Sequence, residues 1–244
     1  KWISTDGKTM WLLYSGLDCD LYSFCLTKAT PETAGEAPSL TEPEAGVSGT
    51  VSIVAVDPEN GICGAAVASK YPAVGKVVPY VRAGVGAFCT QHWHNPKWGE
   101  QALDMLETGK SPEAVLAQLL DGDERADMRQ LAIVDMAGRV PNRNPAKADG
   151  QSVWWGAASG RFYACQGNTL AGRKVIVNMS KAYEQTQGSL TDKLIAALVA
   201  GDTGGGDHRG RLAAGIRIAK EGVEGRWFEL YVDKSDDARS EEHT

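Results

Sequence analysis

Apolar and polar residues alternate where the main part of the chain begins, at Thr50–Asp57 (TVSIVAVD). Alternate positions fall on opposite faces of a strand, and both faces of this one are largely apolar. Asp57–Gly61 (DPENG) favours a turn, and Ile62–Ser69 (ICGAAVAS) is again typical of a strand. The pattern therefore predicts a buried antiparallel hairpin that returns Ser69 and Lys70 to the end where Thr50 begins.

Helices are predicted farther along the chain from capping residues and apolar spacing. Asn95-Pro96 and Ser111-Pro112 each combine a capping side chain with a proline suited to the first helical position, and glycines 109 and 122 end these two helices. Two more helical patterns cover residues 173–186 and 189–200, the second with capping-box spacing. The other expected strands cover residues 76–81, 86–91, 130–134, 161–166, 212–219 and 226–232, with a loop at 158–160.

The order of these elements is strands, two helices, strands, two helices, strands. Short turns join the strands within each group. This order predicts an α+β fold with mostly antiparallel sheets and helices on the outer faces, rather than a doubly wound parallel sheet.

Length and charge limit the function. The chain has 244 residues, 43% of them hydrophobic, which is enough for one large core and an appendage. A formal charge of −6 argues against nucleic-acid or anionic-membrane partners, and no apolar run has the roughly 18 residues of a spanning helix. The chain starts at Lys1 rather than at a methionine, so it leaves a secreted or periplasmic location open.

Residues 1–28 form a separate unit with two or three expected strands. They resemble the closing blade of a β-propeller of the kind found in secreted carbohydrate-active proteins; an extra hairpin packed on the main domain is the alternative. Residues 29–48 have the composition of a flexible linker, and the main domain is expected at 49–238. Residues 239–244 (RSEEHT) resemble a translated sequencing adapter, so they are either an artefactual tail or a charged, disordered terminus.

The number of cysteines is odd, and their spacing fits neither a disulfide framework nor a metal motif. Cys63, Cys89 and Cys165 lie in apolar runs and are expected to be buried thiols. A Cys19–Cys25 bridge is the alternative for the other two.

Thr50 is the first candidate for chemistry. A threonine hydroxyl needs a base to become a nucleophile, and the α-amino group of a chain that began at Thr50 would supply one, with a pKa of about 7.7–8.0. Gly49 would permit the strained turn needed to cut the preceding bond. Lys70 could assist proton transfer if it is partly buried. The alternatives are a threonine that only starts a strand and a lysine that is only a surface charge.

Two later stretches could complete such a site. In Gln166–Gly172 (QGNTLAG), Asn168 could donate to an oxyanion, or it could be an ordinary turn residue. In Gly204–Arg211 (GGGDHRGR), Arg209 could bind a carboxylate and Asp207 could orient it. A flexible loop with surface charges is the alternative for this second stretch.

His92 and His94 suggest a different chemistry, because alternate residues of a strand share one face and imidazoles bind metals. A metal site would need a third ligand, for which Cys89 and Asp207 are the candidates. We expect no metal and no cofactor.

Taken together, these stretches resemble the Ntn-hydrolase-like family known as domain of unknown function 1028. The runs that carry the resemblance are TVSIVAVD at 50–57, GAAVASKYPAVG at 64–75, VPYVRAGVGAFCTQ at 78–91, Asn95-Pro96, RQLAIVD at 129–135, QGNTLAG at 166–172 and GGDHRG at 205–210. The resemblance implies a four-layer αββα sandwich and no settled substrate. In the wider superfamily, an N-terminal Thr, Ser or Cys hydrolyses amide bonds.

Carried over by position, Thr50 would be the nucleophile and general base, Lys70 would tune it, and Asn168 would be an oxyanion donor. Asp207 and Arg209 match the family's glycine-rich motif, with Asp207 assigned to the catalytic group. The residues expected to bind substrate are Ser69, Gln91, Gln166 and Arg209.

The main hypothesis is an amidohydrolase acting on a small or peptide-like amide after cleavage at Gly49–Thr50, because 49 residues precede Thr50. The first rival is a non-catalytic domain of the same fold that binds a small ligand beside a secreted carbohydrate-active module. The second is a metal-dependent hydrolase that uses His92 and His94. Assembly into a homo-oligomer is left open.

Overall fold

The chain divides into two compact units, Lys1–Glu42 and Pro43–Thr244, in a computed structural model that describes residues 2–4, 9–15, 21–27, 49–144, 154–225 and 227–234. In the first unit, β1 (Trp2–Ser4), β2 (Thr9–Ser15) and β3 (Leu21–Thr27) form an antiparallel sheet in that order. The strands agree with the expectation for residues 1–28, and the propeller resemblance stays a prediction. The predicted linker at 29–48, the tail at 239–244 and the Cys19–Cys25 bridge lie outside the described residues.

Two antiparallel sheets form the centre of the second unit. The larger has the order β10-β11-β4-β5-β12-β13, and the smaller has the order β6-β7-β8-β9. The strands of the larger sheet are β4 (Thr50–Asp57), β5 (Ile62–Ser69), β10 (Gly156–Gly160), β11 (Tyr163–Asn168), β12 (Ala213–Lys220) and β13 (Phe228–Val232). Those of the smaller sheet are β6 (Pro79–Arg82), β7 (Gly86–His92), β8 (Arg129–Asp135) and β9 (Asn142–Arg143).

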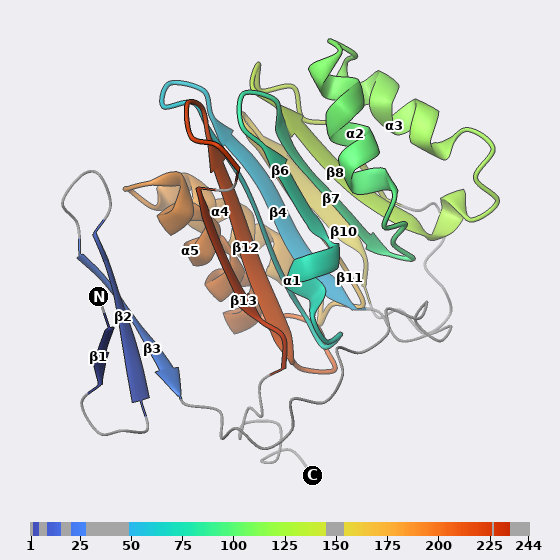
Figure 1. Ribbon diagram of the computed structural model, residues 1–244. Helices are drawn as coiled ribbons and strands as arrows, with labels where there is room; N and C mark the ends of the chain where they lie inside the picture. Colours follow the sequence, from blue (N-terminus) through green and yellow to red (C-terminus); the bar gives the residue numbers. More distant parts are fainter. Residues whose placement is uncertain are drawn as a thin grey trace, which may run out of the picture. The chain divides into compact units, whose positions relative to one another are not determined.

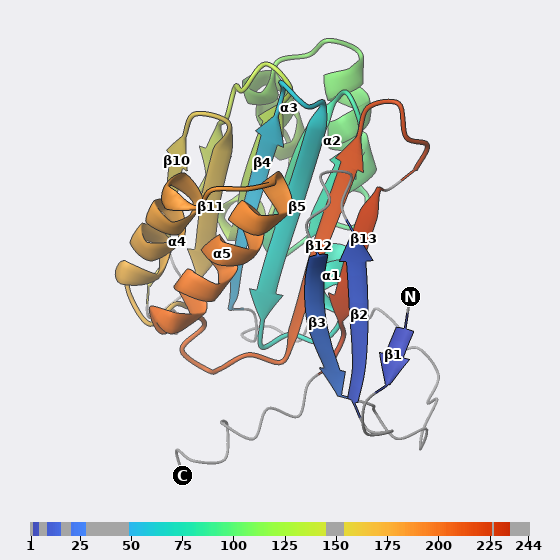
Figure 2. The ribbon, with the colours of Figure 1, turned by 90° about the vertical axis from the view of Figure 1, so that its left-hand side faces the viewer.

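Helices cover the outer face of each sheet, as Figures 1 and 2 show. The helices are α1 (Val74–Val77), α2 (Trp98–Glu107), α3 (Pro112–Leu120), α4 (Lys174–Gln185) and α5 (Leu190–Thr203), with a short 3₁₀ turn at Ala126–Met128. α4 and α5 lie against the larger sheet, and α2 and α3 lie against the smaller one. The second unit is therefore the expected four-layer αββα sandwich. No helix of the described residues is long and apolar enough to cross a membrane.

Each interface between layers has its own apolar core. β4 contributes to two of them, because alternate residues point to opposite sides. Val51 and Ile53 pack under α4 and α5, whereas Val54 and Val56 pack between the two sheets. A third core joins the smaller sheet to α2 and α3. β4 is thus buried on both faces, which explains its nearly continuous apolar sequence.

The sequence predictions hold for most elements, and the structure corrects three of them. Residues 76 and 77, predicted as the start of a strand, belong to the helix α1, and residues 158–160 belong to the strand β10 rather than a loop. α2 begins at Trp98, three residues after the predicted cap Asn95, whose Oδ1 instead accepts from the Lys97 amide at 3.1 Å. The predicted Ser111 cap and the Ser189 capping box are both present.

The three thiols expected in apolar runs are indeed buried and free. Burial raises the pKa of Cys63 and of Cys89 to about 12, and it also raises the pKa of Cys165. A thiol must lose its proton to act as a nucleophile or a metal ligand. These cysteines therefore serve the core.

Candidate functional site

Three strands of the larger sheet bring the predicted site residues to one end of the sandwich. Thr50, the first residue of β4, pairs with Ser69 on β5 and with Asn168 on β11. Both neighbours end their strands, so the three side chains belong to the same sheet edge. All three are buried, Thr50 with 3% of its surface exposed.

The hydroxyl groups of Thr50 and Ser69 contact each other, with their Oγ atoms 3.1 Å apart. Ser69 Oγ donates to the carbonyl oxygen of Gly49 and accepts from the Tyr71 amide at 2.9 Å. A hydroxyl has only one hydrogen to donate. Because Ser69 gives its hydrogen to Gly49, the Thr50 hydroxyl is the donor in the Thr50–Ser69 pair. A chain of two hydrogen bonds therefore leads from Thr50 through Ser69 to the bond that precedes Thr50.

An ion pair between Asp207 and Arg209 in the glycine-rich loop also contacts Gly49. Arg209 donates through Nε and Nη2 to the two carboxylate oxygens of Asp207, at 3.0 and 2.8 Å. Its Nη2 also lies 3.3 Å from the Gly49 carbonyl oxygen. That oxygen is thus held by two side-chain donors, Ser69 and Arg209.

Lys70 reaches this group through its main chain. Its amide donates to Asp207 Oδ2 at 3.3 Å. Its ammonium lies beside the same loop, because a Cβ added at Gly210 would be 3.9 Å from Lys70 Nζ. Of the neighbouring residues Ser69 and Lys70, Ser69 is the one whose side chain contacts Thr50.

Buried amides from both sheets meet behind Thr50. Gln91 Nε2 donates to the Thr50 carbonyl oxygen at 3.3 Å and to Gln130 Oε1 at 2.7 Å. Asn168 Nδ2 donates to the same Gln130 oxygen at 2.9 Å. Asn168, predicted as an oxyanion donor, is therefore engaged with Gln130 in this structure.

Hydrogen bonds fix the direction of the side-chain amides in this network. Gln130 Nε2 donates to the Gly167 carbonyl at 2.9 Å, so Gln130 Oε1 must face Gln91 and Asn168. Ser52 Oγ donates to Gln91 Oε1 at 2.6 Å and accepts from Gln166 Nε2 at 3.3 Å. Gln166 Oε1 has no hydrogen-bond partner among the described residues. The network ties the start of β4 to the smaller sheet.

Unusual backbone conformations gather around the same end. Among the described non-glycine residues, four have a positive φ, and three of these lie here: Ala73, His92 and Thr169, with φ values of 52°, 66° and 55°. The left-handed region is costly for residues with a side chain, most of all for β-branched ones such as threonine. Such strain persists where the surroundings enforce it, commonly at functional sites.

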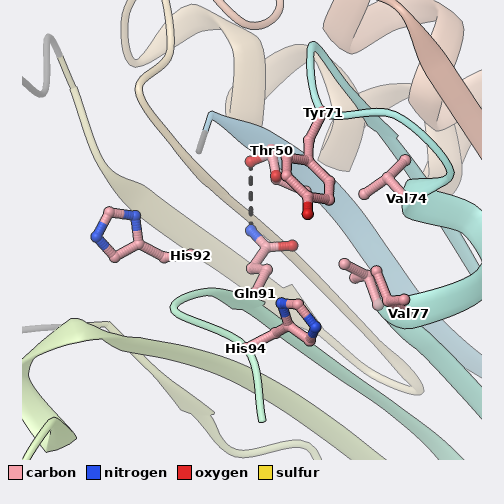
Figure 3. Close-up of a pocket in the computed structure, with 8 residues that line it drawn as sticks. Thr50, Tyr71, Val74, Val77, Gln91, His92 and His94 are labelled. Carbon is pink, nitrogen blue, oxygen red and sulfur yellow. Dashed lines mark hydrogen bonds between the residues drawn. The ribbon is translucent and has the colours of Figure 1, made fainter. Parts of the chain in front are cut away.

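A small pocket opens beside Thr50 (Figure 3). One wall is apolar and consists of Tyr71, Val74, Val77 and Val78. The other is polar and consists of Thr50, Gln91, His92 and His94. The space inside measures about 10 Å³, enough for about one water molecule.

The structure does not support the geometric basis of the metal hypothesis. β7 ends at His92, whose left-handed backbone turns the chain, so His92 and His94 do not share one face of a strand. The His92 ring contacts Trp155 edge-on, with the ring centroids 4.3 Å apart, and Cys89 is packed between the sheets. Among the residues with described positions, no group of three potential ligands could hold a metal ion.

All eight predicted site residues lie in this region, in two connected groups. Thr50, Ser69, Lys70, Asp207 and Arg209 surround the Gly49 carbonyl, and Gln91, Gln166 and Asn168 belong to the amide network. Gln130, Ser52 and Tyr71 were not predicted. The sequence held a signal for Gln130, which is an uncharged polar residue directly before the apolar run of β8 (RQLAIVD).

The comparisons with known proteins agree with this architecture. A sequence profile of the family of unknown function DUF1028 matches residues 50–241. The chain belongs to this family. The crystal structure of the DUF1028 protein SPO2555 from Silicibacter pomeroyi is 27% identical in sequence and superposes with a TM-score of 0.71, covering 78% of this chain and 80% of that one. Curated proteins give no match. The family boundary at residue 50 coincides with Thr50.

Proposed function

We propose that this DUF1028 domain is an amidohydrolase that cuts its own chain between Gly49 and Thr50 and then uses Thr50 as an N-terminal nucleophile. One observation carries the proposal. Ser69 Oγ bridges the Thr50 hydroxyl and the carbonyl oxygen of the bond to be cut.

The first step of self-cleavage follows this hydrogen-bond chain. Thr50 Oγ1 bonds to the Gly49 carbonyl carbon while its proton passes to Ser69 Oγ, and the Ser69 proton passes to the carbonyl oxygen. The product is a neutral tetrahedral intermediate, so no charge develops in a buried site. Arg209 Nη2 supplies a second donor to the same oxygen.

The intermediate then collapses. The bond between the Gly49 carbon and the Thr50 nitrogen breaks, and the hydroxyl proton moves to that nitrogen. This leaves an ester between Gly49 and Thr50 Oγ1 and a free Thr50 amine. Water hydrolyses the ester to a Gly49 carboxylate and a Thr50 hydroxyl.

Turnover uses the same geometry. The freed Thr50 amine, with a pKa of about 7.7–8.0 for an α-amino group, takes the proton from Oγ1 as it attacks a substrate amide. The substrate carbonyl replaces that of Gly49 and accepts from Ser69 and Arg209. The proton goes to the leaving amine, and water releases the acyl group from Thr50. Lys70 tunes the charge of the site, and Asn168 holds Gln130 in place.

Intact-mass analysis of the purified full chain tests the proposal. We expect two fragments, residues 1–49 and a chain that begins at Thr50. Thr50→Ala should stay uncut, Thr50→Ser should still cleave, and Thr203→Ala, on the surface of α5, should cleave like the wild type. A wild-type chain that stays uncut would refute self-processing and favour a non-catalytic ligand-binding domain.

A further inference from the structure

We propose that the pocket beside Thr50 binds the acyl part of the substrate and admits only a very short aliphatic group, of about one carbon beyond the carbonyl. The proposal rests on the hydrolase function above and adds the class of substrate. It follows from the position of the pocket, the chemistry of its walls and the way its apolar wall is held.

The position of the pocket links it to the reacting atoms. Thr50 itself is part of the lining. Tyr71, which also lines the pocket, donates its amide to the Ser69 oxygen that holds the scissile carbonyl. The pocket therefore adjoins the residues that surround the reacting carbonyl.

The chemistry of the walls favours an aliphatic group. Val74, Val77 and Val78 are each 5% exposed or less, and they present only methyl groups. Gln91, on the polar wall, is held by its bonds to Thr50 and Gln130. Pockets of this kind bind apolar groups and orient them with a few fixed polar atoms. The space for about one water molecule limits the guest to a small group.

The apolar wall is rigid, so the pocket cannot widen easily. α1 carries Val74 and Val77, and it packs directly on β12: a Cβ added at Gly75 would be 2.8 Å from the Gly215 Cα. Buried Arg217 donates to the carbonyls of Lys76 and Pro79 at 3.0 and 2.6 Å. These contacts fix the main chain of the helix. The pocket therefore selects substrates by the length of their acyl chain.

Acylation of Thr50 by p-nitrophenyl esters tests the proposal with a readout that needs no natural substrate. In this reaction the Thr50 oxygen bonds to the acyl carbon, the Thr50 amine takes the hydroxyl proton, and p-nitrophenolate leaves. The acetyl, butyryl and hexanoyl esters are compared by the burst of p-nitrophenolate and by the mass added to the Thr50 fragment. Thr50→Ala corrects for acylation elsewhere.

We expect the processed wild type to react with the acetyl ester at least about tenfold faster than with the hexanoyl ester, since one methylene in an apolar pocket changes rates by about 10- to 200-fold. Val77→Ala should raise the butyryl rate by about tenfold, and Val77→Phe should lower the acetyl rate by a similar factor. Val199→Ala, at a residue that is 59% exposed on α5, should keep the wild-type profile.

The outcomes separate this proposal from the one on which it rests. An uncut wild-type chain refutes the hydrolase mechanism. If the chain is processed but no ester acylates it, the acyl-pocket assignment is wrong and self-processing stands. The same conclusion follows if the wild type, Val77→Ala and Val77→Phe all show the same dependence of rate on acyl-chain length.

Discussion

Thr50 and Ser69 stand directly opposite each other across the β4–β5 pair, with their hydroxyl oxygens 3.1 Å apart. Ser69 also donates to the carbonyl of Gly49. One side chain thus connects the candidate nucleophile with the bond that it would attack. The pairing register of two strands, rather than a flexible loop, sets this relationship.

Replacing Ser69 by alanine should slow self-cleavage by about 10²- to 10³-fold, because it removes the proton relay from Thr50 to the Gly49 carbonyl oxygen together with one hydrogen-bond donor to that oxygen. Arg209 would still reach the Gly49 oxygen, so some cleavage should remain. A time course of intact mass measures the rate, and Ser159→Ala on the exposed part of β10 is the matched control. Equal rates in the two variants would remove Ser69 from the mechanism.

Gly49→Ala should block self-cleavage while leaving the fold intact. A Cβ at this position would lie 2.5 Å from Asp207 Oδ2, and Asp207 cannot swing away because Arg209 and the Lys70 amide hold it. The added methyl group must therefore displace the Gly49 carbonyl from Ser69. Intact mass gives the cleavage and circular dichroism gives the fold. Cleavage of Gly49→Ala at the rate of the neighbouring variant Ser48→Ala would contradict this account.

Gln130→Leu should destabilise the protein by about 2–4 kcal/mol, because it leaves several buried polar groups without a partner. Gln91 and Asn168 both donate to Gln130, and Gly167 accepts from it. Urea unfolding measures the change. Gln101→Leu, at an exposed position of α2, should change the free energy of unfolding by less than about 0.5 kcal/mol. If Gln130→Leu lowers the free energy of unfolding no more than the control does, the network contributes little to stability.

The buried thiols should make the protein less stable at alkaline pH. An unfolded cysteine loses its proton near its ordinary pKa of 9.0, whereas Cys63 and Cys89 keep theirs to about 12. Between these values the folded state binds more protons, so the free energy of unfolding falls as pH rises.

Urea unfolding at about pH 8 and about pH 10.5 tests this thiol linkage. Cys89→Ala removes one of the thiols, so its free energy of unfolding should fall less steeply with pH than that of the wild type. If the free energy of unfolding falls equally in the two proteins, the thiols do not cause the loss of stability at alkaline pH.

Much of the fold could be predicted because local patterns and tertiary structure agree. The turn at Asp57–Gly61, the Ser111 cap and the Ser189 capping box all act over a few residues, and all appear as expected. α1 could not be predicted in this way. Its four residues are too few for a helical period, and contacts from Arg217, about 140 residues later in the chain, hold it.

The sequence by itself determined which strand begins with Thr50 and that the strand is buried on both faces, because alternation of side chains is a local property of the chain. It also indicated Ser69, Asn168, Asp207 and Arg209 as polar residues at strand ends and in a glycine-rich loop. Only the tertiary structure decided what they touch. Arg209 meets Gly49 across 160 residues of sequence, and Asn168 turns to Gln130 rather than to the bond between Gly49 and Thr50. Hydrogen bonds form between atoms that the sheets bring together, and sheet register depends on the packing of all four layers.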